Sequence, residues 1–336
     1  MRDACIAVLA AFVFVTAPAV AQDKPSTDKP AAADPARLFA SIVRIKAKAV
    51  ANARSNPTLG REREGTGVVI DDRGHILTIG YVVIEPEAIE VTSAAGVTVP
   101  ASLVGNDHAS GLGIVKASAP FEAPALELGE SAQLGERDPV MVLPFGGRES
   151  ATFARVVSKR PFSGSWEYML DSAIYTSPPS MTWAGAALVS REAKLVGIGS
   201  LLLRDAGGGG QGQPGNMFVP IDVLKPILAE LIRDGKRSGP ARPWLGLATE
   251  PLHGRLFVTR VSPDSPADKA GLKEGDIIVG IGADAVKSHS ELYSRLWRLG
   301  PAGIDVPLKV LQGIDLKDVK VRSIDRLEYF RGKPVL

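Results

Sequence analysis

Residues 180–190 read SMTWAGAALVS, a stretch of small residues that leads into an apolar run. Such a stretch is typical of a tight turn before a buried strand, which can hold one reactive side chain in a fixed pose. The residue at the tip of this turn is Ala184, whose methyl group carries no chemistry. The turn therefore resembles a reactive loop that has no nucleophile.

The other reactive side chains form no pattern of their own. Cys5 is the only cysteine and lies in the N-terminal apolar segment, so the rest of the chain has no thiol. No two histidines lie at the spacing of metal ligands, and no metal site is expected. The glycines at 207–210 are not followed by a Lys-Ser or Lys-Thr pair, so they do not form a phosphate loop and no cofactor is expected. The histidines are His75, His108, His253 and His289.

The N-terminal segment has a short charged start, an apolar run and small residues up to Ala21. This pattern predicts a secretory signal peptide over residues 1–21 that is cleaved after Ala21, and so an exported, periplasmic protein. The apolar run is shorter than the roughly 20 residues of a spanning helix, so no membrane span is expected after cleavage. An uncleaved membrane anchor is the alternative. Residues 22–37, rich in Pro, Ala and charge, predict a disordered tether.

The length and the charge of the remaining chain favour two domains that do not bind nucleic acid. The formal net charge is +2 and arises from mixed signs without a long basic block, whereas nucleic-acid binding depends on clustered Lys and Arg. Between residues 38 and 219, short β-type runs alternate with Gly, Pro and Asp, which predicts an all-β barrel or sandwich. The segment from Ile221 to Arg237 predicts a helix with Asp222 as its N-cap and Pro226 in its first turn.

The order of these motifs resembles the HtrA/Deg family, exported trypsin-like serine proteases with a C-terminal PDZ domain. Three segments carry the resemblance: GTGVVIDDRGHILTIGYVVI, DHASGLGIVK and TWAGAALV. They place Tyr81 in the family's histidine slot, Gly111 in its aspartate slot and Ala184 in its serine slot. The resemblance implies a mainly β fold, a chymotrypsin-like double β-barrel followed by a small α+β PDZ domain. The expected domains are 38–236 (protease-like), 241–325 (PDZ) and a tail at 326–336.

These slots contain none of the groups that the triad needs. In a triad the serine attacks, the imidazole takes its proton, and the carboxylate orients the imidazole. Removing such a constellation costs about 10⁶ in turnover, so the resemblance implies a pseudoprotease whose triad is lost. The ring of Tyr81 is expected to fill the vacated space. The alternative is a relocated nucleophile that pairs with His108; the serines near the old position are Ser177, Ser180 and Ser190.

The second domain is expected to bind peptides. The stretch SPADKAGLKEGDIIVGIGADAV closely resembles an HtrA-type PDZ domain, and PDZ domains bind extended chain ends by strand addition. By resemblance, the loop that captures the terminal carboxylate is Trp244, Leu245, Gly246 and Leu247. Leu292 and Leu296 share a helix face and are expected to line the side-chain pocket. The alternative is that these leucines are only core and that a segment of the same chain closes the groove.

The expected function is therefore that of an exported binding, scaffold or regulatory protein, which acts through its PDZ domain on C-terminal or unfolded segments of exported proteins. The alternative from the enzyme class is a serine-type endopeptidase of envelope protein quality control with a non-standard nucleophile. Association with an active HtrA-type protease is a further possibility. HtrA proteins commonly form trimers through N-terminal apolar contacts, and Leu38 and Phe39 are the candidates for a homo-oligomer contact.

Overall fold

The computed structural model of the chain describes residues 35–120 and 122–330. The predicted signal peptide, nearly all of the predicted tether and the last residues of the predicted tail lie outside these ranges. Within them, strands dominate, and no helix has both the length and the apolar character needed to cross a membrane.

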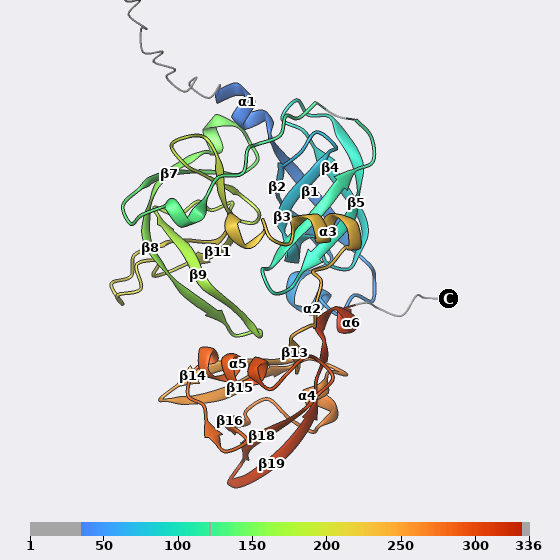
Figure 1. Ribbon diagram of the computed structural model, residues 1–336, viewed down its shortest axis with the longest axis vertical. Helices are drawn as coiled ribbons and strands as arrows, with labels where there is room; N and C mark the ends of the chain where they lie inside the picture. The colour runs from blue at the N-terminus through green and yellow to red at the C-terminus, as the bar shows by residue number, and fades with distance from the viewer. Residues whose placement is uncertain (1–34, 121, 331–336) are drawn as a thin grey trace, which may run out of the picture. The chain divides into compact units, whose positions relative to one another are not determined.

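The N-terminal part of the described chain is a closed antiparallel barrel (Figure 1) with strand order β1-β2-β3-β6-β5-β4. It is preceded by the short helix α1, and its connections include the helix α2 and the 3-10 turn η1. Apolar side chains alternate along β1 and point inward, while β3 is buried along its whole length. The bounds are α1 Pro35–Ala40, β1 Ile42–Ala49, α2 Asn56–Leu59, β2 Glu62–Val69, β3 His75–Ile79, η1 Gly80–Val82, β4 Pro86–Thr92, β5 Thr98–Asp107 and β6 Leu112–Ala117.

A second closed barrel follows, with strand order β10-β11-β12-β9-β8-β7. Closure of both sheets leaves no unpaired strand edge in either barrel. The bounds are η2 Ser131–Gln133, β7 Pro139–Leu143, η3 Arg148–Ser150, β8 Thr152–Gly164, β9 Tyr168–Ser177, β10 Ala187–Val189, β11 Leu195–Leu203, β12 Gly215–Pro220, η4 Ile221–Val223 and α3 Leu228–Asp234.

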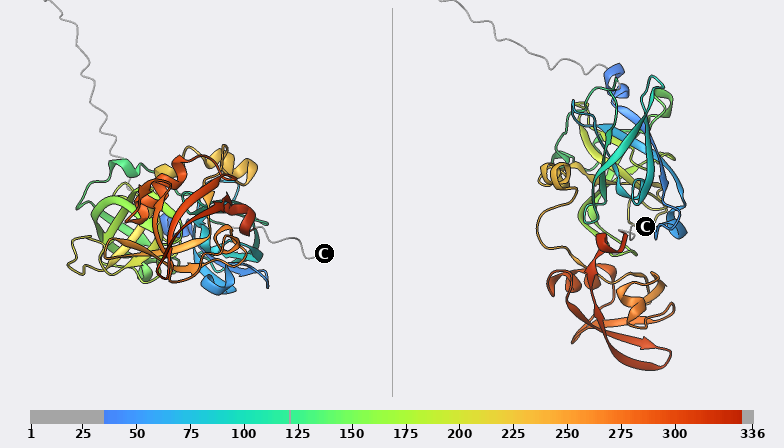
Figure 2. Two further views of the ribbon diagram at one scale, coloured as in Figure 1. Left: turned by 90° about the horizontal axis from the view of Figure 1, so that it is seen from below. Right: turned by 90° about the vertical axis from the view of Figure 1, so that its right-hand side faces the viewer.

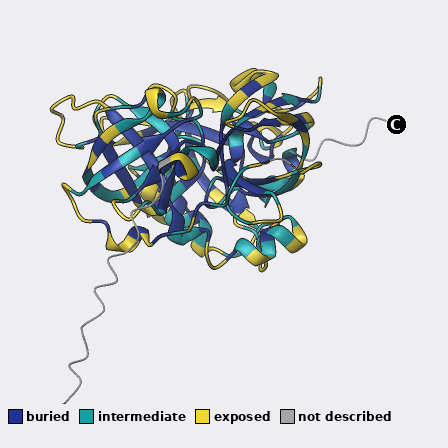
Figure 3. Cartoon of the chain, turned by 90° about the horizontal axis from the view of Figure 1, so that it is seen from above, coloured by how far each residue is buried: buried dark blue, intermediate teal, exposed yellow. Residues whose placement is uncertain are grey.

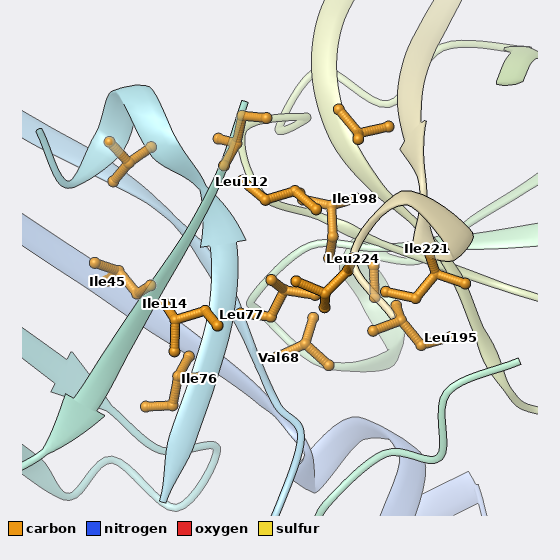
Figure 4. Close-up of a cluster of buried hydrophobic side chains, with 14 of the residues drawn as sticks. Ile45, Val68, Ile76, Leu77, Leu112, Ile114, Leu195, Ile198, Ile221 and Leu224 are labelled. Carbon is orange, nitrogen blue, oxygen red and sulfur yellow. The ribbon is translucent and has the colours of Figure 1, made fainter. Parts of the chain in front are cut away.

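The two barrels share a continuous hydrophobic core. Figure 4 shows Leu77 of β3 beside Leu224, which follows η4, and both side chains are fully buried. The buried residues lie on the barrel strands and the exposed ones mainly in the connections (Figure 3). Leu38 belongs to the same core, and Phe39 packs against it. Both residues were expected as candidates for an oligomer contact. In the structure, Leu38 is buried and Phe39 is partly buried against the core of the same chain.

The predicted helix at the end of the barrels begins later than expected. Ile221–Val223 forms the 3-10 turn η4, and the helix α3 covers only Leu228–Asp234. Pro226 lacks an N–H and disfavours the helical conformation of the residue before it. Asp222 does not cap the helix: its side chain accepts a hydrogen bond from the N–H of Ala132 at 2.7 Å.

The C-terminal domain has a sheet with the strand order β14-β15-β16-β18-β19, and β17 pairs with β16. Its helix α5 begins at a capped end, because Ser288 accepts from the N–H of Glu291 and Glu291 accepts from the N–H of Lys287. Figure 2 shows the long β18–β19 hairpin in red. The bounds are β13 Pro243–Trp244, β14 Leu247–Leu252, β15 Arg255–Val261, α4 Pro266–Lys269, β16 Ile277–Ile281, β17 Asp284–Ala285, α5 His289–Arg298, β18 Asp305–Gln312, β19 Asp315–Arg322, β20 Ile324–Asp325 and α6 Arg326–Phe330.

Two closed barrels followed by a small α+β domain confirm the predicted fold class. The helix α6 lies within the segment expected as a tail, and the strand before it, β20, pairs with β13.

Candidate functional site

The end of β3 turns directly into η1, which carries Tyr81. The Oη of Tyr81 donates a 2.9 Å hydrogen bond to the carbonyl oxygen of Ser200 in β11, so the phenol joins the two barrels. Arg63 of β2 holds the turn by donating to the carbonyl oxygens of Tyr81 and Ile84, at 3.4 and 2.8 Å. Burial raises the pKa of the Tyr81 phenol above its ordinary value. The phenol therefore stays protonated at neutral pH and acts as a hydrogen-bond donor.

Gly111 lies just before β6 and has a φ of +78°, a backbone conformation that glycine adopts without strain. Its carbonyl oxygen accepts a 2.7 Å hydrogen bond from the N–H of Gly80, the residue before Tyr81. A Cβ added to Gly111 would lie 3.1 Å from the Oη of Tyr168. That Oη donates to the carbonyl oxygen of Ser110 at 2.6 Å. A side chain at position 111 would therefore require the ring of Tyr168 to shift slightly, in addition to the strain of the positive φ.

Hydrogen bonds of the backbone fix the turn that carries Ala184. The carbonyl oxygen of Ala184 accepts from the N–H of Thr66 in β2 at 2.8 Å, and Gly185 donates to the carbonyl oxygen of Gly199 in β11 at 2.9 Å. Gly185 has a φ of +75°, and a Cβ there would lie 2.0 Å from the carbonyl oxygen of Thr66. The turn is thus held against both barrels with a methyl group at its tip.

The segments of Tyr81, Gly111 and Ala184 converge. Gly65 of β2 lies between two of them, because a Cβ on it would be 2.9 Å from Val82 and 3.1 Å from the carbonyl oxygen of Ala184. Gly111 joins them through its hydrogen bond to the residue before Tyr81. Where these segments meet, Tyr81 contributes a phenol, Gly111 only a hydrogen and Ala184 a methyl group.

Among the described residues, no group of His, Cys, Asp and Glu side chains could hold a metal ion. The ring of His75 is hydrogen-bonded to Asp71 and that of His289 to the carbonyl oxygen of Thr249, neither of them to a serine. His108 is partly buried, its ring lies 5.5 Å from that of Phe330, and the loss of solvent around the ring lowers its pKa to about 3. An imidazole with so low a pKa is a weak base at neutral pH. Among the described residues, the Nε2 atom of His108 has no hydrogen-bond partner. It is therefore not bonded to Ser177, Ser180 or Ser190.

In the C-terminal domain, the segment that leads into β14 binds a carboxylate of the same chain. The backbone N–H groups of Leu245, Gly246 and Leu247 donate to the carboxylate of Glu167 at 2.9, 2.7 and 2.9 Å. Glu167 lies between β8 and β9 and is buried. Burial raises the pKa of Glu167, while these N–H donors and the charge of Arg326 oppose the rise. The three N–H groups form an anion-binding loop, and a side chain from the second barrel fills it.

The β8–β9 turn is also hydrogen-bonded to two further elements of this domain, β14 and α5. On the β14 side, the N–H of Thr249 donates to the carbonyl oxygen of Ser165 at 3.1 Å. On the α5 side, the Oη of Tyr293 donates to the carbonyl oxygen of Gly164 at 2.7 Å and accepts from the N–H of Glu167 at 3.0 Å. The turn therefore lies against both β14 and α5, in addition to placing Glu167 in the loop.

Comparison with known proteins finds a family match for the double barrel and another for the C-terminal domain. Residues 65–198 match the trypsin-like peptidase domain, and residues 243–322 match the PDZ domain. The chain is 30% identical over 274 residues to a probable periplasmic serine endoprotease DegP-like of Hahella chejuensis, covering 76% of this chain and 56% of that protein. It is 26% identical over 292 residues to the periplasmic serine endoprotease DegP of Escherichia coli K12, covering 80% and 60%. The chain is a relative of the HtrA/Deg proteins.

This HtrA/Deg relative spans a little over half the length of the two curated proteins, 56% and 60%. Among solved structures, the HtrA-type protease AlgW with a decapeptide is similar, with a TM-score of 0.52 and 20% identity over 89% of this chain and 98% of the other. That likeness concerns the fold, a trypsin-like double barrel with a PDZ domain.

The residues predicted for peptide binding have different places in the PDZ domain. The segment Leu245–Leu247 supplies the N–H groups of the anion-binding loop. Trp244 packs its ring against that of Tyr329, with the centroids 4.6 Å apart. Leu292 and Leu296 of α5 are 2% and 0% exposed and belong to the core of the domain. Sequence reasoning missed Glu167, because its turn, SGSWEY, carries no recognisable motif.

Proposed function

We propose that this protein is a pseudoprotease, which does not hydrolyse peptides with its barrels and binds chain ends of other proteins through its PDZ domain. One observation supports the proposal: the three segments that resemble the family's triad segments converge, and the residues in the corresponding slots are Tyr81, Gly111 and Ala184. Hydrolysis by this fold needs a serine that attacks, an imidazole that takes its proton and a carboxylate that orients the imidazole. A neutral phenol, a hydrogen and a methyl group cannot act as the nucleophile, the base and the orienting carboxylate.

The environment of Tyr81 supports this proposal further. Its Oη already donates a hydrogen bond to Ser200, and burial raises its pKa. A general base must be available to accept a proton and have a pKa near the working pH. Tyr81 meets neither requirement, so we assign it a structural role between the barrels.

We propose that the ligands are C-terminal or unfolded segments of exported proteins, bound in the periplasm. Two relatives are named as periplasmic proteases, and the N-terminal segment has the pattern of a signal peptide. The donors in the PDZ loop are backbone N–H groups, which bind a carboxylate whatever the side chains are. Such a protein would act as a scaffold or as a regulator of an active protease.

Exposure of the purified protein to a fluorophosphonate, followed by intact-mass measurement, tests the loss of catalysis. This reagent phosphonylates activated serines with loss of fluoride, so no adduct is expected. The matched variant is Ala184→Ser, which restores the nucleophile alone. It is also expected to stay unlabelled, because no imidazole is present to activate the serine.

Escherichia coli DegP, treated in parallel, serves as the positive control for labelling. An adduct on the parent protein would contradict the proposal, and peptide mapping of the labelled protein would then locate the nucleophile. An adduct on Ala184→Ser alone would mean that a usable base survives near the barrels, and the assignment of Tyr81 would then be wrong.

A further inference from the structure

The carboxylate of Glu167 lies in the PDZ loop in the way that a chain end would. It accepts hydrogen bonds from three successive backbone N–H groups, those of Leu245, Gly246 and Leu247. Successive N–H groups that point to one place form a concavity that binds anions, and PDZ domains use this loop to capture a terminal carboxylate. In this chain, the N–H donors of the loop are therefore already hydrogen-bonded to a side chain of the same chain.

The backbone next to Glu167 also follows the register of a bound peptide. Ser165 lies two residues before Glu167, and its carbonyl oxygen accepts from the N–H of Thr249 at 3.1 Å. Thr249 lies two residues after Leu247, the last donor of the loop. A peptide that adds to β14 as a strand, with its carboxylate in the loop, needs the same N–H group. The turn is thus bonded to an N–H group of β14 as well as to the N–H groups of the loop.

The contacts with α5 and α6 hold the turn from its other side. Tyr293, which is 1% exposed, bonds to the carbonyl oxygen of Gly164 and to the N–H of Glu167. Arg326 donates to the carbonyl oxygen of Trp166 at 3.2 Å, and its positive charge acts on the carboxylate of Glu167. These contacts satisfy polar groups of the turn that would otherwise be buried without partners.

We propose that residues 164–167 are an internal ligand of the PDZ groove, with the side chain of Glu167 as a surrogate chain end, and that a peptide with a free C-terminal carboxylate must displace them to bind. This inference rests on the proposed function, since it concerns regulation of the same groove. A tethered ligand acts at an effective concentration of about millimolar. Only the molecules whose loop is free of Glu167 can bind a peptide. The apparent dissociation constant of the peptide is therefore its intrinsic value divided by the fraction of such molecules.

The test compares the full chain with Glu167→Gln, which keeps the shape of the side chain and removes its charge. The control is Glu250→Gln, which makes the same change at an exposed residue of β14 for which no hydrogen bond or ion pair is seen. The probe is a mixture of fluorescein-labelled heptapeptides randomised at the last three positions, with a free carboxylate or with a terminal amide. Hydrogen exchange of the amides of residues 245–249 is measured on the same samples.

In Glu167→Gln, exchange of these amides is expected to become at least about tenfold faster, and the carboxylate-ended mixture is expected to bind about tenfold more tightly than to the parent. The Glu250→Gln variant is expected to behave as the parent does, and the amidated mixture to bind to none of them. Unchanged exchange of residues 277–281, in β16, shows that the domain stays folded.

Two other outcomes overturn the inference in distinguishable ways. Equal binding of the carboxylate-ended mixture to the parent and to Glu167→Gln, with unchanged exchange, would mean that the turn does not compete; peptide binding as proposed would stand. Faster exchange in Glu167→Gln without binding to any variant would mean that the groove takes no chain ends, and the proposed function would fall with the competition.

Discussion

Gly185→Ala is expected to lower the free energy of unfolding by about 3 kcal/mol or more. The φ of +75° at this position costs an alanine about 1–2 kcal/mol. The added Cβ would also lie 2.0 Å from the carbonyl oxygen of Thr66 and 2.6 Å from Oγ1 of Thr78. Overpacking of this kind costs about 1–3 kcal/mol. The turn cannot retreat without loss of the hydrogen bond between Ala184 and Thr66.

The matched control is Gly96→Ala. Gly96 has a φ of +84°, but no heavy atom lies within 4 Å of its added Cβ. That variant should lose only about 1–2 kcal/mol, the cost of the backbone conformation alone. Urea denaturation of both variants, compared by their midpoints at equal slope, measures the difference. Equal losses would mean that the turn relaxes around the new methyl group, and the pose of Ala184 would then not be rigid.

Much of the fold could be predicted because its signals are local. Short apolar runs between Gly, Pro and Asp indicated strands, and the closure of each set of strands into a barrel came from the family resemblance. The helix after β12 begins later than predicted because Pro226 interrupts it, and the predicted N-cap is wrong because that side chain has a distant partner. Asp222 has the composition of an N-cap, yet it accepts from the N–H of Ala132, 90 residues away, and a single sequence does not reveal such a partner.

The candidate sites show the same limit. The positions of Tyr81, Gly111 and Ala184 followed from ungapped motifs, but the acceptor of the Tyr81 phenol is Ser200, 119 residues further on. Likewise, the donors of the PDZ loop could be predicted from the motif, whereas Glu167 lies 78 residues before Leu245. The alternative of a groove closed by the same chain was therefore open in the sequence, and the segment that closes it was not identifiable there.

Tyr293→Phe is expected to lower the free energy of unfolding by about 2 kcal/mol and to open the PDZ groove. The lost hydroxyl serves two backbone groups, the carbonyl oxygen of Gly164 and the N–H of Glu167. Each buried polar group left without a partner costs about 1–3 kcal/mol. The turn can limit this cost by leaving the groove for water, so the carboxylate-ended peptides should bind more tightly than to the parent. The donors of the PDZ loop are unchanged in this variant.

Tyr175→Phe is the matched control, because Tyr175 is 2% exposed and its Oη donates to the carbonyl oxygen of Pro161 across a long 3.4 Å. A bond of that length contributes little, so a loss below about 1 kcal/mol and unchanged peptide binding are expected. Urea denaturation gives both stabilities, and the heptapeptide mixture gives the binding. A stability loss in Tyr293→Phe without tighter binding would mean that the turn stays in the groove. The hydroxyl would then stabilise the domain without controlling access to its loop.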